Sequence, residues 1–181
     1  MKKKVAVLVG SLRKESFHRR IALELIRLSP DGLNMQLVEI GELNLYNEDL
    51  EEHAPKAWTD YRKKIGETDA ILFVSPEYNR SIPGVLKNAI DIATRPPTEN
   101  VLLRKPAAVV TGSSSGIGGF GSNHAIRQSV VFSQVRMLPN EVYIGQMDKR
   151  FKEDEKTLVD DTQKYLKKFL KEFEEWIILF S

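Results

Sequence analysis

Short apolar runs alternate along this chain with longer segments in which apolar residues recur every three or four positions. Apolar runs bounded by turn residues are typical of buried parallel strands, whereas the longer spacing is typical of helices with one buried face. The runs predict strands at Val5–Val9, Met35–Ile40, Ala70–Val74 and Ala107–Thr111, and a fifth within Met137–Ile144 that Pro139 interrupts. The helical spacing predicts helices at about Ser16–Leu28, from Pro55 through Ile65, from Pro83 to the residue before Arg95, at Asn123–Gln134 and at Asp154–Phe180.

The order of these elements predicts the fold class. Strands and helices alternate from one end of the chain to the other, with no internal repeat and no linker. This alternation is typical of a doubly wound α/β protein, in which right-handed crossovers place helices on both faces of a parallel sheet. We therefore predict a single domain over residues 1–181. If its five strands are ordered 2-1-3-4-5, the loops after the first, third and fourth strands are neighbours at the edge where such sheets bind ligands.

The loop after the first strand has the features of a phosphate site. Gly10 suits a tight turn because glycine adopts positive φ without a steric penalty, and Ser16 stands where a helix N-cap belongs. Ser11, Arg13 and Ser16 would then place two hydroxyls and a guanidinium beside the positive end of a helix, where phosphates bind. The alternative is an ordinary βα turn that binds nothing. No Gly-Lys-Ser/Thr follows, so the loop is not of the nucleoside-triphosphate type.

The loop after the third strand has a different character. Pro76, Glu77, Tyr78 and Asn79 combine a rigid turn, an aromatic ring and consecutive N–H groups after the proline. Backbone donors beside a ring suit a flat heterocycle with carbonyl and imide edges. The alternative is a proline-stiffened connection in which Tyr78 packs on its own helix.

The loop after the fourth strand contains two motif-like matches. Residues Gly116–Gly121 satisfy G-x-G-x-x-G, but they follow a late strand and do not open a βαβ unit as the dinucleotide fingerprint requires. Residues Gly112–Gly116 satisfy G-x-S-x-G with Ser114 as the nucleophile, a motif that expects an acid and then a histidine downstream. His124 is the only later histidine, and no acid lies between Ser114 and His124. We therefore interpret this stretch as a flexible loop whose backbone can approach a ligand closely.

Composition and charge exclude several classes of protein. With 41% hydrophobic and 29% charged residues, the chain has the composition of a globular protein. A formal net charge of +2 and scattered basic residues argue against a nucleic-acid partner. There is no cysteine, no apolar run of the roughly 20 residues that a membrane span needs, and no signal-peptide pattern, so we predict a cytoplasmic protein without a membrane partner. The dispersed histidines predict no metal site, and His18 in the first turn of the first helix faces either a phosphate or solvent.

Two segments resemble a known family. Residues Gly10–Phe17 (GSLRKESF) and Pro76–Asp91 (PEYNRSIPGVLKNAID) closely resemble the NADPH-dependent FMN reductase family, which includes bacterial chromate/quinone reductases and azoreductase-like enzymes. The resemblance extends over essentially the whole chain, including Leu45-Tyr46 and the Gly-Gly loop after the fourth strand. It implies a flavodoxin-like fold that binds FMN non-covalently and forms a homodimer or homotetramer.

Matching positions imply the residues of the cofactor site. Ser11, Arg13 and Ser16 would hold the FMN phosphate, Pro76–Asn79 would line the isoalloxazine, and Ser113 would approach its other edge. The residues predicted to bind FMN are Ser11, Leu12, Arg13, Ser16, Phe17, His18, Pro76, Glu77, Tyr78, Asn79 and Ser113. The family often has Asn in place of His18, and relatives often carry Arg and Gln after the Gly-Gly where this chain has Gly121 and Asn123. The choice between NADH and NADPH and the oligomer interface stay open.

The resemblance also implies the reaction. NADPH or NADH would reduce FMN, and a small-molecule acceptor such as a quinone, an azo compound, chromate or free flavin would then take the electrons. The cofactor carries this chemistry, so no catalytic side chain is predicted. One rival is a flavodoxin-type electron carrier without NAD(P)H activity, a class that is typically strongly acidic, unlike this chain. A second rival is a structural domain that binds no flavin.

Overall fold

The apolar runs form a single parallel sheet in the computed structural model, which describes residues 1–154 and 156–180. The strand order is β2-β1-β3-β4-β5, and β6 pairs with β4 beyond the end of β5. This confirms the predicted order. The strands are β1 (Lys3–Val9), β2 (Leu33–Leu37), β3 (Ala70–Ser75), β4 (Pro106–Gly112), β5 (Arg136–Met137) and β6 (Val142–Ile144).

The fifth predicted strand is divided where the sequence places Pro139. β5 pairs with the beginning of β4 through Arg136, and β6 pairs with its end, with Ile144 opposite Gly112. Proline has no N–H to donate to the ladder, so the pairing stops and resumes on its far side. The last strand position is thus filled by two short segments in line.

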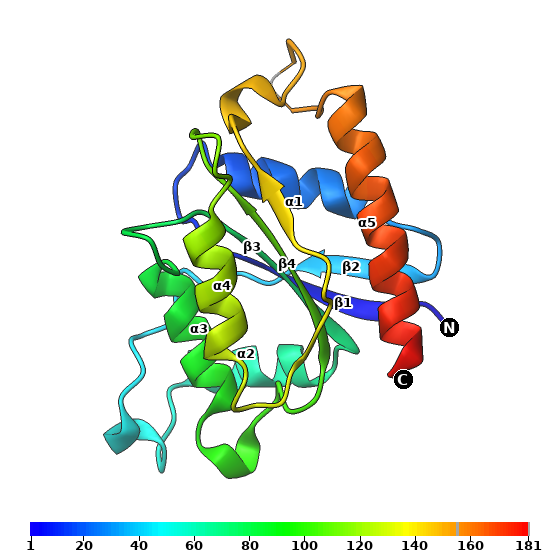
Figure 1. Cartoon of the computed structure of the whole chain (residues 1–181). Coiled ribbons are helices and arrows are strands. Elements are labelled where there is room, and N and C mark those ends of the chain that lie inside the picture. The colour runs from blue at the N-terminus through cyan, green and yellow to red at the C-terminus, as the bar shows by residue number, and fades with distance from the viewer. Residues whose placement is uncertain (155, 181) are drawn as a thin grey trace.

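Helices cover both faces of the sheet (Figure 1). They are α1 (Phe17–Arg27), α2 (Lys56–Gly66), α3 (Gly84–Thr94), α4 (Phe120–Ser129) and α5 (Asp160–Leu179), with 3-10 turns η1 (Glu48–Leu50), η2 (Pro97–Glu99) and η3 (Met147–Lys149). On β1, Val5, Val7 and Val9 pack with α1 and α5, whereas Ala6 and Leu8 pack with α2, α3 and α4. This alternation explains why the strand is apolar throughout, because each face is buried under a helical layer.

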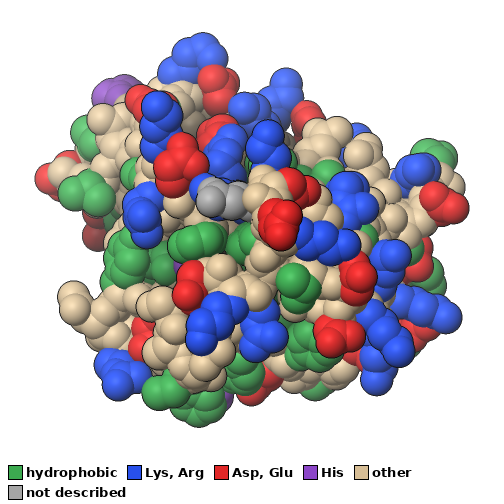
Figure 2. Space-filling view, turned by 90° about the horizontal axis from the view of Figure 1, so that it is seen from above, with side chains coloured by type: hydrophobic (Ala, Val, Ile, Leu, Met, Phe, Trp, Pro, Cys, Tyr) green, Lys and Arg blue, Asp and Glu red, His purple; other side chains and the backbone are tan. Residues whose placement is uncertain are grey.

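The surface carries charges of both signs. Figure 2 shows Lys and Arg side chains interspersed with Asp and Glu over the face seen from above. This mixture differs from the single-sign stripe that a nucleic-acid surface presents. Among the described residues, no helix is both long enough and apolar enough to cross a membrane.

The predicted start of α4 was wrong because a cap comes from another loop. The helix begins at Phe120 and not at Asn123. The Glu77 carboxylate accepts hydrogen bonds from the N–H groups of Gly121 (2.6 Å) and Ser122 (3.3 Å), which satisfies the first turn of the helix. A cap that is distant in the sequence cannot be read from the local pattern.

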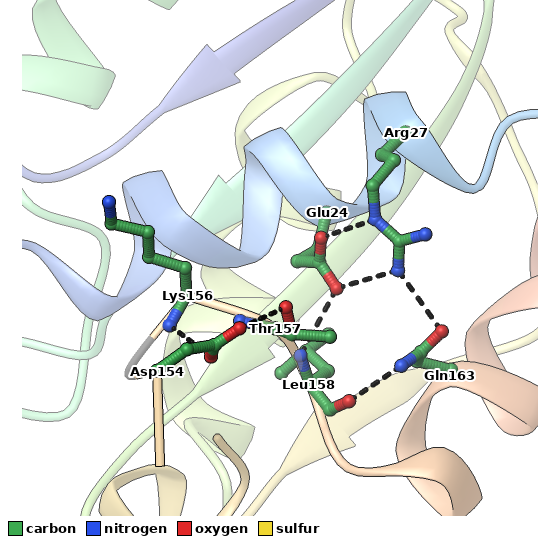
Figure 3. A network of polar contacts seen from close by, with 7 residues as sticks. All are labelled: Glu24, Arg27, Asp154, Lys156, Thr157, Leu158 and Gln163. Carbon is green, nitrogen blue, oxygen red and sulfur yellow. Dashed lines mark hydrogen bonds and ion pairs between the residues drawn. The ribbon is translucent and has the colours of Figure 1, made fainter. Parts of the chain in front are cut away.

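The predicted start of α5 was also wrong. The carboxylate of Asp154 accepts the N–H groups of Lys156 (2.9 Å) and Thr157 (2.8 Å), which closes a turn, so the helix begins only at Asp160 (Figure 3). Three further differences occur elsewhere: α4 ends at Ser129 and not at Gln134, β2 ends at Leu37 and not at Ile40, and Pro83 is the N-cap of α3 and not its first residue.

A buried carboxylate joins α1 to the segment that leads into α5 (Figure 3). Glu24 is 6% exposed and accepts hydrogen bonds from the Leu158 N–H (3.1 Å) and from Arg27 (2.6 and 2.9 Å). Arg27 also donates to Gln163, which donates to the carbonyl of Leu158. The hydrogen bond from Arg27 lowers the pKa of Glu24. The network fixes the start of the last helix against the first.

Replacing Glu24 with Ala should lower the free energy of unfolding by about 2 kcal/mol, because it leaves the buried Leu158 N–H without an acceptor. The lowered pKa means that the wild-type contribution is complete above the carboxyl pKa of the unfolded chain and is lost as the pH falls through the folded value. Urea unfolding of both proteins at neutral and acidic pH measures this. Asp60→Ala, which removes the exposed pair with Lys56, is the matched control and should leave the midpoint unchanged.

Candidate functional site

The carboxyl ends of β1, β3 and β4 open onto one cavity of about 210 Å³. The three loops therefore lie together, as predicted, and they do so at the point where the strand order reverses. Its walls are formed by Ser11, Arg13, Ser16, Phe17, His18, Pro76, Glu77, Tyr78, Gly112, Ser113, Ser114 and Met147. This is the place at which doubly wound sheets bind their ligands.

A larger cavity of about 390 Å³ lies elsewhere. It runs beside the edge strand β2, and its walls include Asn34, Gln36 and the end of α2 at Lys64. It lies away from the switch point of the sheet and from the glycine- and serine-rich loops. We therefore place the candidate site at the three-loop cavity.

Glycine is required at position 10 because the backbone there lies close to side chains of β3 and α3, and not because φ is positive. Among the described glycines, only Gly118 and Gly119 have φ in the left-handed region. A Cβ on Gly10 would lie 2.6 Å from Oγ of Ser75 and 3.3 Å from a methyl carbon of Leu86. The predicted positive φ is thus wrong, and the glycine instead lets the first loop lie directly on the end of β3.

Ser16 caps α1, as its position in the sequence predicted. Its backbone is extended (φ −77°, ψ 119°) and its Oγ accepts the Arg19 N–H at 3.2 Å. Ser11 is buried, and its Oγ accepts the Arg13 N–H at 3.4 Å. Both hydroxyls are acceptors in these contacts, so each keeps its proton for a ligand.

Positive charge and free donors surround these hydroxyls. In the part of the chain that the structure describes, no carboxylate pairs with the Arg13 guanidinium, and the backbone N–H groups of Phe17 and His18 have no acceptor. The first turn of α1 holds no acidic residue. A guanidinium, two hydroxyls and the first N–H groups of a helix form a site for an anion with several oxygens.

His18 lies in the wall of the cavity, but one of its nitrogens is engaged. Nε2 donates to the carbonyl oxygen of Gly112 at 3.1 Å, and the residue is 6% exposed. Burial lowers the pKa of His18 to about 4, against the opposing effect of the Gly112 hydrogen bond, and the charge of Arg13 adds to the lowering. The ring is therefore neutral at pH 7. Of the two environments predicted for it, the structure excludes solvent.

The loop after β3 forms a tight hairpin turn. The Tyr78 N–H donates to the Ser81 carbonyl (3.1 Å), and the Ser81 N–H donates back to Tyr78 (2.9 Å). Asn79 and Arg80 between them have positive φ (51° and 64°). The Tyr78 N–H is therefore occupied, so the predicted run of consecutive free donors is wrong. Tyr78 is 48% exposed in the cavity wall and is not packed away on its own helix.

Glu77 has a structural contact that the sequence did not suggest. Its side chain is 12% exposed, because it caps α4 through Gly121 and Ser122 and pairs with Arg80 at 3.5 Å. The contact joins the hairpin after β3 to the helix that follows the loop after β4. Glu77 is also a residue of the cavity wall.

The loop after β4 is held by the segment that follows β6. The Ser113 N–H donates to the Ile144 carbonyl (3.0 Å), and the Met147 N–H donates to the Ser113 carbonyl (3.1 Å). The Ser113 hydroxyl contacts Ser115. Met147 itself is a cavity residue that sequence reasoning missed, because only the returning chain brings it beside Gly112, where a Cβ would lie 2.4 Å from its sulfur.

The hydrolase motif has no catalytic geometry. His124 contacts the Phe120 carbonyl (3.0 Å) and lies 3.8 Å from Glu141, and among the described residues no hydrogen bond joins it to Ser114. A serine nucleophile needs a base within hydrogen-bond reach.

Of the residues predicted to bind the cofactor, Leu12 and Asn79 lie outside the cavity wall and the rest are in it.

The sheet order, the anion site at the switch point and the half-exposed ring define a flavodoxin-like, mononucleotide-binding α/β protein. Comparison with known proteins narrows this class. Over 177 residues the chain is 50% identical to a quinone reductase of Pseudomonas putida, covering 97% of this chain and 95% of that protein. It is 37% identical over 175 residues to a 2-hydroxy-1,4-benzoquinone reductase of a Burkholderia species, covering 96% of each.

A solved structure agrees in fold as well as in sequence. FerB, a flavoenzyme NAD(P)H:(acceptor) oxidoreductase from Paracoccus denitrificans, superposes with a TM-score of 0.90 at 37% identity over 98% of each chain. Residues 3–149 match the family described as NADPH-dependent FMN reductase. The chain belongs to this family. It is an oxidoreductase with FMN as its cofactor and a nicotinamide nucleotide as its electron donor.

Proposed function

We propose that the three-loop cavity binds FMN with its phosphate on Ser11, Arg13, Ser16 and the N-terminus of α1. The observation that carries this proposal is the Arg13 guanidinium, which has no carboxylate partner among the described residues and stands beside two hydroxyl donors at a helix N-terminus. A phosphate dianion requires several charge-assisted donors, and this donor set supplies them. The residues present therefore fit the cofactor of the family.

The opposite walls of the cavity suit the flavin ring. Pro76 and the half-exposed Tyr78 offer apolar surface. The N–H groups of Glu77, in the cavity wall, and of Asn79, which follows Tyr78 in the chain just outside that wall, have no acceptor among the described residues. Ser113, from the loop after β4, is also a residue of the cavity wall. When bound, FMN supplies the hydride acceptor and donor of the reaction. The protein orients the ring, and the backbone donors would stabilise the charge that the reduced ring carries.

We propose a quinone as the electron acceptor. Two close relatives are named for quinone substrates. A flat, apolar acceptor can stack beside the exposed ring of Tyr78. The same open cavity would admit the nicotinamide and then the quinone in turn.

Anaerobic mixing tests the proposal. The purified protein, loaded with FMN, should lose the visible absorbance of its oxidised flavin when NADPH or NADH is added. A benzoquinone should then restore that absorbance. A flavodoxin-type carrier would stay oxidised with both nicotinamides although dithionite reduces it, and a flavin-free domain would take up no FMN. Either result would contradict the proposed function.

We propose further that residues 1–181 act as one FMN-binding domain within a homodimer or homotetramer. Leu103, Val131 and Phe132 are 51%, 69% and 82% exposed on segments joined by the hydrogen bond from the Arg104 N–H to Ser133. Exposed apolar side chains that gather in one place favour association. Light scattering from the FMN-loaded protein gives the mass, and a monomer at micromolar concentration would contradict the assembly.

A further inference from the structure

His18 joins two of the three loops that enclose the cavity. It lies in the first turn of α1, and its Nε2 donates at 3.1 Å to the carbonyl of Gly112, the last residue of β4. Among the described residues, no other hydrogen bond joins residues 11–18 to residues 112–116. This side chain therefore provides the one hydrogen bond between the phosphate loop and the serine loop among the described residues.

The accepting residue has little freedom to move. A Cβ on Gly112 would lie 2.4 Å from the sulfur of Met147, and a Cβ on Gly119 would lie 3.2 Å from the Gly112 nitrogen. Ser113 follows directly and is held by Ile144. In such a closely packed region, a displacement of the Gly112 carbonyl would move Ser113 with it.

The position of the proton on His18 argues against a direct contact between its side chain and the phosphate. A carbonyl only accepts hydrogen bonds, so the proton of the neutral ring is on Nε2 and Nδ1 is an acceptor. A phosphate oxygen needs a donor, and Nδ1 could serve as one only if the ring took up a second proton. Burial opposes that charge, since it lowers the pKa of His18 to about 4.

We propose that His18 is a positioning residue of the FMN site, whose bond to Gly112 holds the Ser113 loop at a fixed separation from the phosphate loop. The inference rests on the proposed binding of FMN in this cavity. His18 then acts on the ring side of the cofactor through Ser113, although it stands beside the phosphate loop. This separates it from Ser11, Arg13 and Ser16, which are proposed to act on the phosphate itself.

Three substitutions separate a positioning role from a phosphate contact. Gln can place its amide nitrogen near the position of Nε2, Asn can place it only near Nδ1, and Leu has no donor. Dissociation constants of FMN and of riboflavin, which lacks the phosphate, are measured by quenching of flavin fluorescence. His18→Asn and His18→Leu should raise the dissociation constants of both flavins by about tenfold, which corresponds to the loss of one hydrogen bond. In His18→Gln both constants should stay within about threefold of the wild-type values.

The absorption spectrum of bound FMN provides a second readout. It should shift in His18→Asn and His18→Leu, because the environment of the ring changes, and it should match wild type in His18→Gln. If the substitutions lowered the affinity for FMN and left the affinity for riboflavin unchanged, the result would overturn the proposal in favour of a phosphate contact. Full affinity in His18→Asn together with a loss in His18→Gln would overturn it as well. A wild-type protein that binds neither flavin would instead refute the proposed function, and this inference with it.

Discussion

Arg13→Ala should raise the dissociation constant of FMN by about ten- to a hundredfold. The guanidinium has no carboxylate partner among the described residues, so its charge is available to the phosphate. Hydrogen bonds to charged groups contribute about 1.5–3 kcal/mol, which corresponds to that range of affinity. Titration of the FMN-free protein with FMN, followed by flavin fluorescence, gives the constant directly.

The neighbouring residue Lys14 provides the matched control. It is exposed and carries the same charge, but it is not in the wall of the cavity. Lys14→Ala should therefore change FMN affinity little, and Arg13→Ala should leave riboflavin affinity nearly unchanged because riboflavin has no phosphate. An Arg13→Ala protein with wild-type affinity for FMN would exclude this loop as the phosphate site.

Gly121→Ala should lower the free energy of unfolding by about 1–3 kcal/mol, the usual cost of forcing a methyl group into filled space. The new Cβ would lie 2.5 Å from the carbonyl oxygen of Arg80 and 3.0 Å from Oε2 of Glu77. Both atoms belong to the contact between the hairpin and α4. The Arg80 carbonyl is part of the backbone, so it cannot move aside as easily as the end of a flexible side chain. The hairpin would shift, so Tyr78 would move in the cavity wall and FMN binding would weaken.

Gly84→Ala is the control for this substitution. Both glycines lie in the first turn of a helix, but a Cβ on Gly84 meets nothing within 4 Å. Alanine there should be neutral or stabilise slightly, because it restricts the unfolded chain and favours the helix. Urea unfolding of both variants makes the comparison. Equal midpoints for the two variants would show that the hairpin is not packed against α4 as described.

The residues proposed to hold the phosphate could be selected from the sequence because they are contiguous. Ser11, Arg13 and Ser16 lie within one βα turn, and Ser16 caps its own helix through Arg19. Local geometry of this kind is set by neighbours in the chain, so residue spacing suffices. The reason for Gly10 was misread, because its neighbour Ser75 belongs to another strand, and Leu12 lies outside the cavity wall.

The ring side could be predicted only in part. Pro76 and Tyr78 were found from their place after a central strand, but the donor pattern was not, since the turn occupies the Tyr78 N–H. The capping role of Glu77 and the presence of Met147 had no signal in the sequence. Each depends on a contact with a segment that is far away along the chain.

The sequence by itself predicted the class of fold and the loop proposed to receive the phosphate, because hydrophobic periodicity and local turn chemistry act over a few residues. The order of the strands followed from the resemblance to a known family, and the structure confirms it. The tertiary structure alone decided where α4 and α5 begin, what closes the cavity and which partner holds His18. Those features depend on distant segments brought together by packing of the two helical layers on the sheet. No local pattern specifies which distant carbonyl or carboxylate a given donor will meet.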